Sequence, residues 1–178
     1  PELILRLEVE VYSSGFGVYD IFINGQRIGT PQSDGSYVYD EFKPGWTDYR
    51  KTVFYSTYDI TKLLKDGQNA LGAHVSSGWL TGAIAHNEYG NPDPGFLAKI
   101  VVIYSDNSQE IIVTNPTNWK ASANSAIRMA DIYHGETYDA RKESDWSMPG
   151  FDVSDWNGTE INDYFNGDIL SFIGEPVR

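Results

Sequence analysis

The 178-residue chain has no cysteine and is poor in basic side chains. The lack of cysteine excludes disulfides, zinc–thiolate sites and thiol nucleophiles, and it leaves the redox compartment open. Thirteen lysines and arginines stand against 25 aspartates and glutamates, which gives a formal net charge of −12. Because an acidic chain repels phosphate backbones and anionic lipids, we expect neither nucleic acid nor a membrane surface as a partner.

Long apolar runs are also missing. The longest ones have the length of a strand, well short of the ~20 residues that a membrane-spanning helix needs. The chain starts at Pro1 and shows no basic-then-apolar leader, which indicates a processed product or an excised fragment. Its localisation therefore stays open.

Aromatic residues and glycines, in contrast, are abundant. Tyr, Phe and Trp make up 14% of the chain, and there are 17 glycines. This composition is typical of an all-β domain with many turns, and it is common in carbohydrate-handling modules. The length suits one well-buried domain, in which folding removes roughly 70% of the surface of the unfolded chain.

Short strand patterns separated by turn residues recur along the chain, as in a β-sandwich or barrel. Residues 3–12 (LILRLEVEVY) alternate cleanly, and Asn24-Gly25 is a strong tight-turn pair. Further strands are expected at residues 17–23, 52–58, 70–75, 96–104, 109–114, 119–121 and 126–133, with one helical turn at 62–65. The sequence therefore predicts about eight strands and minimal helix. We expect a β-sandwich accessory domain over residues 1–163 and a connector to a following domain over residues 164–178.

Two long loops, residues 30–51 and 78–95, contain most of the candidate binding residues. In an antiparallel sandwich, successive connections alternate between the two ends. Counted from the turn at residues 13–17, both long loops and the HGETYDAR segment (134–141) fall at one end, which we call the rim. The residues expected there include Asp40, Glu41, Trp46, Asp48, Trp79, His86, Asn87, Glu88, Tyr89, Asp93, Glu136 and Asp139.

Two interpretations of the rim stay open. Planar rings beside carboxylates and hydroxyls suit a small polyhydroxylated ligand, but Trp46 and Tyr49 would equally well seal the end of a core. Asp40-Glu41 and residues 87–93 offer the oxygen ligands that calcium prefers, or else form a solvated acidic surface. The three histidines lack the spacing of a zinc site. We expect no catalytic residue, because a small sandwich rim seldom forms the cleft in which two carboxyl groups hydrolyse a glycoside.

Five motifs together carry a resemblance to a known family. In order, they are FINGQRIG, PGWTDYRKTVFYSTYDIT, GQNALGAHVSSGWLTG, YGNPDPGFLAKI and DIYHGETYDAR. As an ordered set they resemble the N-terminal β-sandwich domain of bacterial α-L-rhamnosidases, glycoside hydrolase family 78, over roughly residues 15 to 156. PGFDVSDW also resembles the FDDSxW signature found beside sugar-binding sandwich domains of several glycosidases.

The resemblance implies a jelly-roll β-sandwich of the galactose-binding-like kind. It also implies a parent enzyme that hydrolyses terminal α-L-rhamnose with inversion, using acidic residues of a separate helical barrel, so that this chain is non-catalytic. Some relatives bind rhamnose through calcium, which bridges loop oxygens to sugar hydroxyls. On this basis the expected sugar-binding residues are Trp46, Trp79, Asn87 and Tyr89, and the expected calcium ligands are Asp40, Glu41 and Asp93.

A second interpretation gives the domain a purely structural role. It would then orient the catalytic barrel or mediate dimerisation, and the same aromatic side chains would be interface anchors. The expected partners are therefore a rhamnose-containing carbohydrate, other domains of the same polypeptide and, in the second interpretation, a second copy.

Overall fold

The computed structural model describes residues 5–86, 88–90 and 92–178. Its strands are β1 (Arg6–Phe16), β2 (Val18–Ile23), β3 (Gln26–Arg27), β4 (Thr30–Pro31), β5 (Tyr37–Val38), β6 (Thr52–Asp59), β7 (Leu71–Ser76), β8 (Gly95–Tyr104), β9 (Gln109–Val113), β10 (Lys120–Ala121), β11 (Ile127–Asp131), β12 (Gly135–Tyr138), β13 (Asn157–Gly158) and β14 (Asp168–Ser171). Its helices are single turns: η1 (Thr61–Leu63), α1 (Gly78–Thr81), η2 (Ala83–Ala85) and η3 (Ala140–Lys142). No helix within these described residues has the length and apolar character to cross a membrane.

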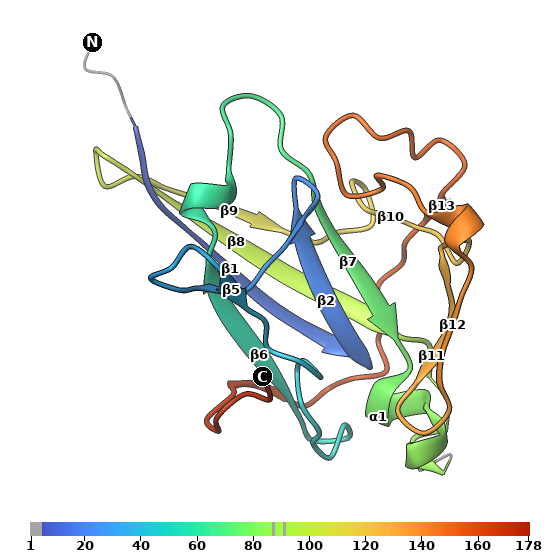
Figure 1. The fold of residues 1–178 in the computed structure, drawn as a ribbon. Helices are drawn as coiled ribbons and strands as arrows, with labels where there is room; N and C mark the ends of the chain where they lie inside the picture. Colours follow the sequence, from blue (N-terminus) through green and yellow to red (C-terminus); the bar gives the residue numbers. More distant parts are fainter. Residues whose placement is uncertain (1–4, 87, 91) are drawn as a thin grey trace.

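Two sheets pack face to face (Figure 1). The larger has the order β14-β6-β1-β8-β9, and the smaller has the order β3-β2-β7. The pairs of β1 with β6 and β8, and of β8 with β9, are antiparallel, whereas β14 runs parallel to β6. β1 passes directly into β2 through Gly17, so the chain changes sheets within one residue.

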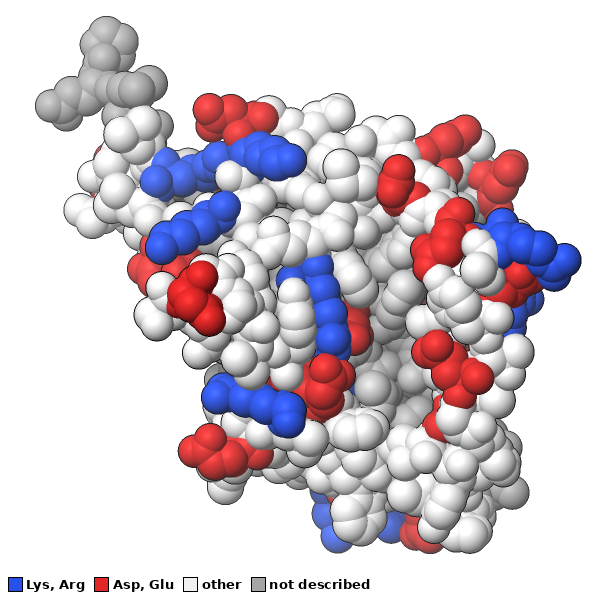
Figure 2. All heavy atoms as spheres, viewed as in Figure 1, with Lys and Arg blue, Asp and Glu red and all other residues white. Residues whose placement is uncertain are grey.

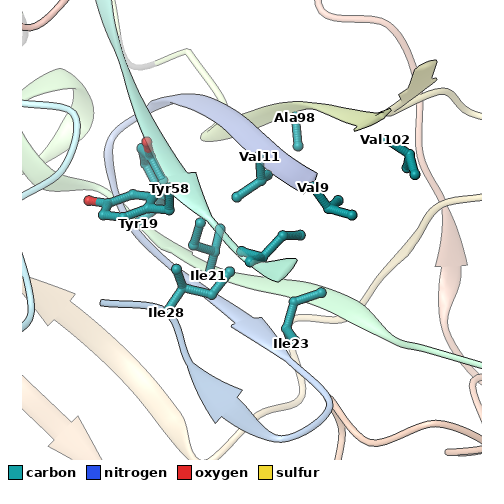
Figure 3. Close-up of a cluster of buried hydrophobic side chains, with 10 residues drawn as sticks. Val9, Val11, Tyr19, Ile21, Ile23, Ile28, Tyr58, Ala98 and Val102 are labelled. Atoms are coloured by element: carbon teal, nitrogen blue, oxygen red, sulfur yellow. The ribbon is translucent and has the colours of Figure 1, made fainter. Parts of the chain in front are cut away.

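The core lies between these sheets. Because side chains alternate along a strand, every second residue of β1 and β2 points inward. Figure 3 shows the cluster that results, which consists mainly of Val9, Val11, Tyr19, Ile21, Ile23, Ile28, Tyr58, Ala98 and Val102. The buried Tyr19 hydroxyl donates to the Ser13 carbonyl at 2.8 Å, and burial raises the pKa of Tyr19 to about 12.

The all-β prediction is confirmed, and all eight expected strands agree with the structure to within about four residues at each end. The described residues contain fourteen strand segments rather than about eight, because the sequence did not mark the two-residue strands β3, β4, β5 and β13 or the four-residue strands β12 and β14. The last of the expected strands, residues 126–133, corresponds to β11, after which the chain turns back and β12 pairs with β11.

The expected connector, residues 164–178, packs on the sandwich. Tyr164 and Phe165 lie against a second buried cluster, and β14 adds a strand to the larger sheet. The sequence predicted no strand there. The boundary at residue 163 stays a prediction.

An aromatic stack covers the outer face of the smaller sheet. The His74 ring stacks on Trp146 with ring centroids 4.3 Å apart, and Phe22 meets the same tryptophan at 5.2 Å. A Cβ at Gly72 would lie 2.5 Å from the Trp146 ring, so glycine permits this close packing. Burial lowers the pKa of His74 below its usual 6.5, although the carboxylates of Asp20 and Glu143 act in the opposite direction.

The free energy of unfolding should fall more steeply toward acid in the wild type than in His74→Phe. Because the pKa of folded His74 is depressed, the unfolded chain binds this proton first as the pH falls. The stability contributed by the neutral ring is therefore complete above about pH 6.5 and is lost below it. Urea unfolding of both proteins, once above and once well below that pH, measures the effect. An identical loss in both would contradict it.

Candidate functional site

A buried lysine holds the loop at residues 40–46 against β2. The Lys43 side chain is 3% exposed, and its ammonium donates to an Asp20 carboxylate oxygen at 2.6 Å and to the Asp40 carbonyl. The Tyr19 amide donates to the Lys43 carbonyl at 3.0 Å. The Arg27 guanidinium also pairs with Asp20, at 2.8 Å from the other carboxylate oxygen. Since charge-assisted hydrogen bonds are the strong ones, this network fixes the loop.

The two carboxylates expected to bind calcium already have protein donors. The Tyr58 hydroxyl donates to one oxygen of Asp40 at 2.9 Å, and Arg178 Nε donates to the other at 3.1 Å. Glu41 accepts two bonds from the Arg27 guanidinium, at 2.7 and 3.1 Å. Burial, together with the Asp40 carboxylate, raises the pKa of Tyr58. Both carboxylates are therefore neutralised without a metal.

The third expected calcium ligand, Asp93, is exposed. Asn87, an expected sugar-binding residue, lies outside the described residues. In the part of the chain that the structure describes, no three or more His, Cys, Asp or Glu side chains gather closely enough to hold a metal ion. Asp40, Glu41 and Asp93 are thus not brought together as one ligand set, and calcium binding stays a prediction.

Of the expected aromatic residues, two are packed and one is free. The Trp79 ring, in α1, meets Phe42 at 5.7 Å. The Tyr89 ring lies 5.3 Å from that of buried Tyr49, and its hydroxyl donates to the Thr47 carbonyl at 3.3 Å. Trp46 is 66% exposed. The sequence interpretation that both Trp46 and Tyr49 seal a core end therefore holds for Tyr49 alone.

The second buried cluster joins the two long loops. Tyr49, Val53 and Leu80 are buried at its centre. Phe16, Trp79, Tyr89, Tyr164 and Phe165 pack around them. The Arg50 guanidinium lies 3.3 Å from Glu88 and 5.6 Å from the centre of the Tyr89 ring. These contacts confirm that residues 30–51 and 78–95 meet at one end of the sandwich, the lower end in Figure 1.

The third expected segment reaches the rim only in part. Asp131, before the turn at residues 132–134, accepts from the backbone amides of Ala83 at 2.7 Å, Tyr133 at 2.8 Å and His134 at 2.9 Å. These donors, with Ala83 first, lower the pKa of the Asp131 carboxyl. The prediction was wrong for Asp139, because β12 carries the chain back to the far end of the hairpin, where the Asp139 amide donates to the Ala126 carbonyl at 2.8 Å.

Sequence reasoning missed Phe42 and Lys43. Phe42 is exposed, adopts a positive φ of 56° and lies against Trp79. Lys43 is a single lysine in a loop, a residue that is ordinarily solvated, so no pattern marked it for burial. Phe42 and Trp46, which flank Lys43 and Pro44, are the exposed rings of the loop at residues 40–46; we call them the rim aromatics.

The arrangement suits binding of a small, uncharged, partly apolar ligand. The rim aromatics offer ring faces, and the nearby carboxylates Asp40 and Glu41 keep acceptor capacity beside their arginines. On the face shown in Figure 2, acidic side chains are interspersed with basic ones, without a continuous basic patch.

Comparisons with known proteins agree with the motifs. The family described as "Alpha-L-rhamnosidase N-terminal domain" matches residues 7–178. The α-L-rhamnosidase of Streptomyces avermitilis is 42% identical over 173 residues, which cover 94% of this chain and 16% of that protein. The α-L-rhamnosidase of Alteromonas sp. is 40% identical over 161 residues, which cover 88% of this chain and 16% of that protein.

Solved structures show the same fold. The crystal structure of the Streptomyces avermitilis α-L-rhamnosidase complexed with L-rhamnose superposes with a TM-score of 0.84 at 37% identity, over 99% of this chain and 17% of that one. The α-L-rhamnosidase from Dictyoglumus thermophilum gives a TM-score of 0.80 at 35% identity, over 96% of this chain and 18% of that one. The chain thus spans about one sixth of the relatives that it matches. It belongs to the family of α-L-rhamnosidase N-terminal domains.

Proposed function

We propose that this chain is a non-catalytic domain of an α-L-rhamnosidase and that its rim aromatics bind rhamnose-containing carbohydrate. The relatives are α-L-rhamnosidases about six times as long as the region they share with this chain. Hydrolysis of terminal α-L-rhamnose, with inversion, would then be carried out by acidic residues in another domain of the parent enzyme.

The exposed ring of Trp46 is the observation that carries the binding proposal. A large aromatic side chain in water loses the hydrophobic stabilisation that burial would supply. The backbone beneath it is nevertheless held by the Lys43 network and by buried Tyr49. A ring on a rigid loop loses little conformational entropy when a ligand stacks on it, because it is already positioned.

The carboxylates of the rim support a non-catalytic role. A glycosidase needs one carboxyl group as acid and a second as base or nucleophile across a substrate cleft. Asp40, Glu41 and Asp48 instead each pair with arginine. The Asp48 carboxyl has a lowered pKa, with hydrogen bonding from Arg50 as the main cause, so it is a poor proton donor near neutrality.

Titration of the chain with L-rhamnose tests the proposal. We expect residue-specific NMR shifts near Trp46, and about a tenfold weaker Kd in Trp46→Ala, equal to about 1.4 kcal/mol. Tyr138→Ala is the matched control, since Tyr138 is exposed on β12 at the end of the hairpin away from the rim. The absence of any shift up to about 50 mM rhamnose, far above a millimolar Kd, would contradict sugar binding and favour the purely structural role.

The same titration in calcium and in a chelator tests the metal. A calcium ion at Asp40 or Glu41 would have to displace Arg178 or Arg27. Because these ion pairs already occupy both carboxylates, we expect the same Kd for rhamnose in calcium and in the chelator. Binding that disappears in the chelator would instead support the calcium site predicted from the sequence.

Incubation with an aryl α-L-rhamnoside tests the catalytic part of the proposal. We expect no turnover by this chain. Turnover that a single carboxylate substitution abolishes would overturn the non-catalytic role.

A further inference from the structure

The face of the larger sheet that points away from the core carries an apolar surface. Paired residues of neighbouring strands point to the same side of a sheet. Tyr12 pairs with Lys99 and Lys99 with Val113, and Ile169 of β14 lines the same hollow as these residues. The outer apolar surface, as we call it, consists of Tyr12, Tyr55, Leu97, Ile111, Val113 and Ile169.

This surface is open to solvent and hollowed at its centre. Leu97, Ile111, Val113 and Ile169 are between 43% and 59% exposed. Leu97, Val113 and Ile169 line a cavity of about 390 Å³ together with Lys99, Tyr12 and Tyr55. The rings of the two tyrosines are 6.0 Å apart. The outward face of an antiparallel sheet is normally polar, and contiguous apolar patches on soluble proteins usually mark contact sites.

One edge of the surface is equally unprotected. β9 is the last strand of its sheet in the described residues, and all five of its residues are exposed. Isoleucines 111 and 112 and Val113 stand in a row along it. Native proteins commonly cover or charge such edges, because an open apolar strand recruits other chains.

The charged and polar side chains around the surface indicate which charges a docked partner would carry. The Tyr12 hydroxyl donates to Glu10, and the Lys99 ammonium lies 4.9 Å from the centre of the Tyr12 ring. Glu8 and Glu10 precede Tyr12 on the same face of β1. A matching partner would therefore be apolar at its centre and basic opposite Glu8 and Glu10.

We infer that another domain of the same rhamnosidase polypeptide packs on this outer apolar surface. The inference rests on the proposed function, since the relatives hold about five sixths of their length outside the region shared with this chain. β14, close to the C-terminal end of this chain, forms one edge of the surface through Ile169. A tethered domain meets such a surface at a high effective concentration, so an interface of modest size is enough to keep it docked.

Thiol labelling tests the inference, because the chain has no cysteine of its own. Leu97→Cys and Val113→Cys are made separately in the parent enzyme and in the 178-residue chain, and labelling is followed by peptide mass spectrometry. We expect labelling at least about tenfold slower in the parent, since it would require the interface to open. Gln68→Cys, on an exposed turn outside the larger sheet, corrects for access of the reagent.

Equal labelling rates in the two proteins, after this correction, would overturn the inference. It would also be overturned if labelling of the 178-residue chain slowed with rising concentration while sedimentation showed dimers, because the occupant would then be a second copy. The parent is assayed with an aryl α-L-rhamnoside in parallel. If the cysteines are protected in the parent but the parent does not hydrolyse the rhamnoside, the proposed function is refuted and the docking surface is supported. If the parent hydrolyses the rhamnoside but the cysteines are not protected, the docking inference is refuted and the proposed function is unaffected.

Discussion

Asp20→Ala is expected to lower the free energy of unfolding by about 3 kcal/mol, the lower end of the range for breaking a buried ion pair. The substitution leaves the Lys43 ammonium, which is 3% exposed, with the Asp40 carbonyl but without the carboxylate that neutralises it. The lower end applies because the Asp20 side chain is 31% exposed, so water screens part of the interaction. Urea unfolding measures the loss.

Asp66→Ala is the matched control for this prediction. It removes an aspartate that pairs with Arg6 at 3.5 Å on the open surface, and we expect no measurable change. Equal midpoints for the two variants would show that Lys43 needs no anionic partner. The double variant Asp20→Leu with Lys43→Met should recover most of the loss, because apolar replacement of a buried pair is often neutral.

The same network links stability to the candidate site. Loosening residues 40–46 removes the support beneath Trp46, so Asp20→Ala should also weaken rhamnose binding in the titration proposed above. Asp66→Ala should leave that binding unchanged, since Asp66 lies in the turn between η1 and β7.

Gly17→Ala is expected to cost about 2–5 kcal/mol, the sum of strain from a positive φ and of overpacking. Gly17 has a φ of 112° at the corner where β1 passes into β2, and a Cβ there would lie 2.0 Å from the Ser76 carbonyl oxygen. That oxygen belongs to β7, which is paired with β2 along its whole length, so it has little room to move.

Gly35→Ala separates the two contributions. Its φ is 85°, but no atom lies within 4 Å of the position that its Cβ would take. We therefore expect only the strain, about 1–2 kcal/mol. Thermal or urea unfolding of both variants measures the difference. Equal losses would mean that the sheet corner yields to the methyl group and that the close approach is not needed to join the sheets.

The larger strands were predictable because their signal is local. Residues 52–58 alternate within the strand itself, and Asn24-Gly25 adopts the positive φ values of a tight hairpin turn. The gathering of residues 30–51 and 78–95 at one end followed from the alternation of the connections between the main strands. β14 was missed because its pairing with β6 joins residues more than 100 positions apart and gives a four-residue segment no period of its own.

The candidate site could be predicted only in outline. Trp46 and Trp79 stand in similar glycine-containing contexts, yet one is open to water and the other lies against Phe42. Burial depends on which segment folds over which ring, and nothing within a few residues of either tryptophan encodes it. In the sequence Asp40 likewise looks like a free metal ligand, whereas in the structure it is paired with Arg178, 138 positions away.

The sequence by itself therefore determined the fold class, the main strands, the family and the two loops that meet at the rim. Each of these depends on short-range periodicity, turn chemistry or an ordered set of motifs. Only the tertiary structure decided that Asp40 and Glu41 are ion-paired, that Trp46 rather than Trp79 is open to water, and that one sheet face is left apolar and uncovered. Those features arise from contacts between residues distant in the chain, where packing and charge pairing select among side chains that look equivalent in the sequence.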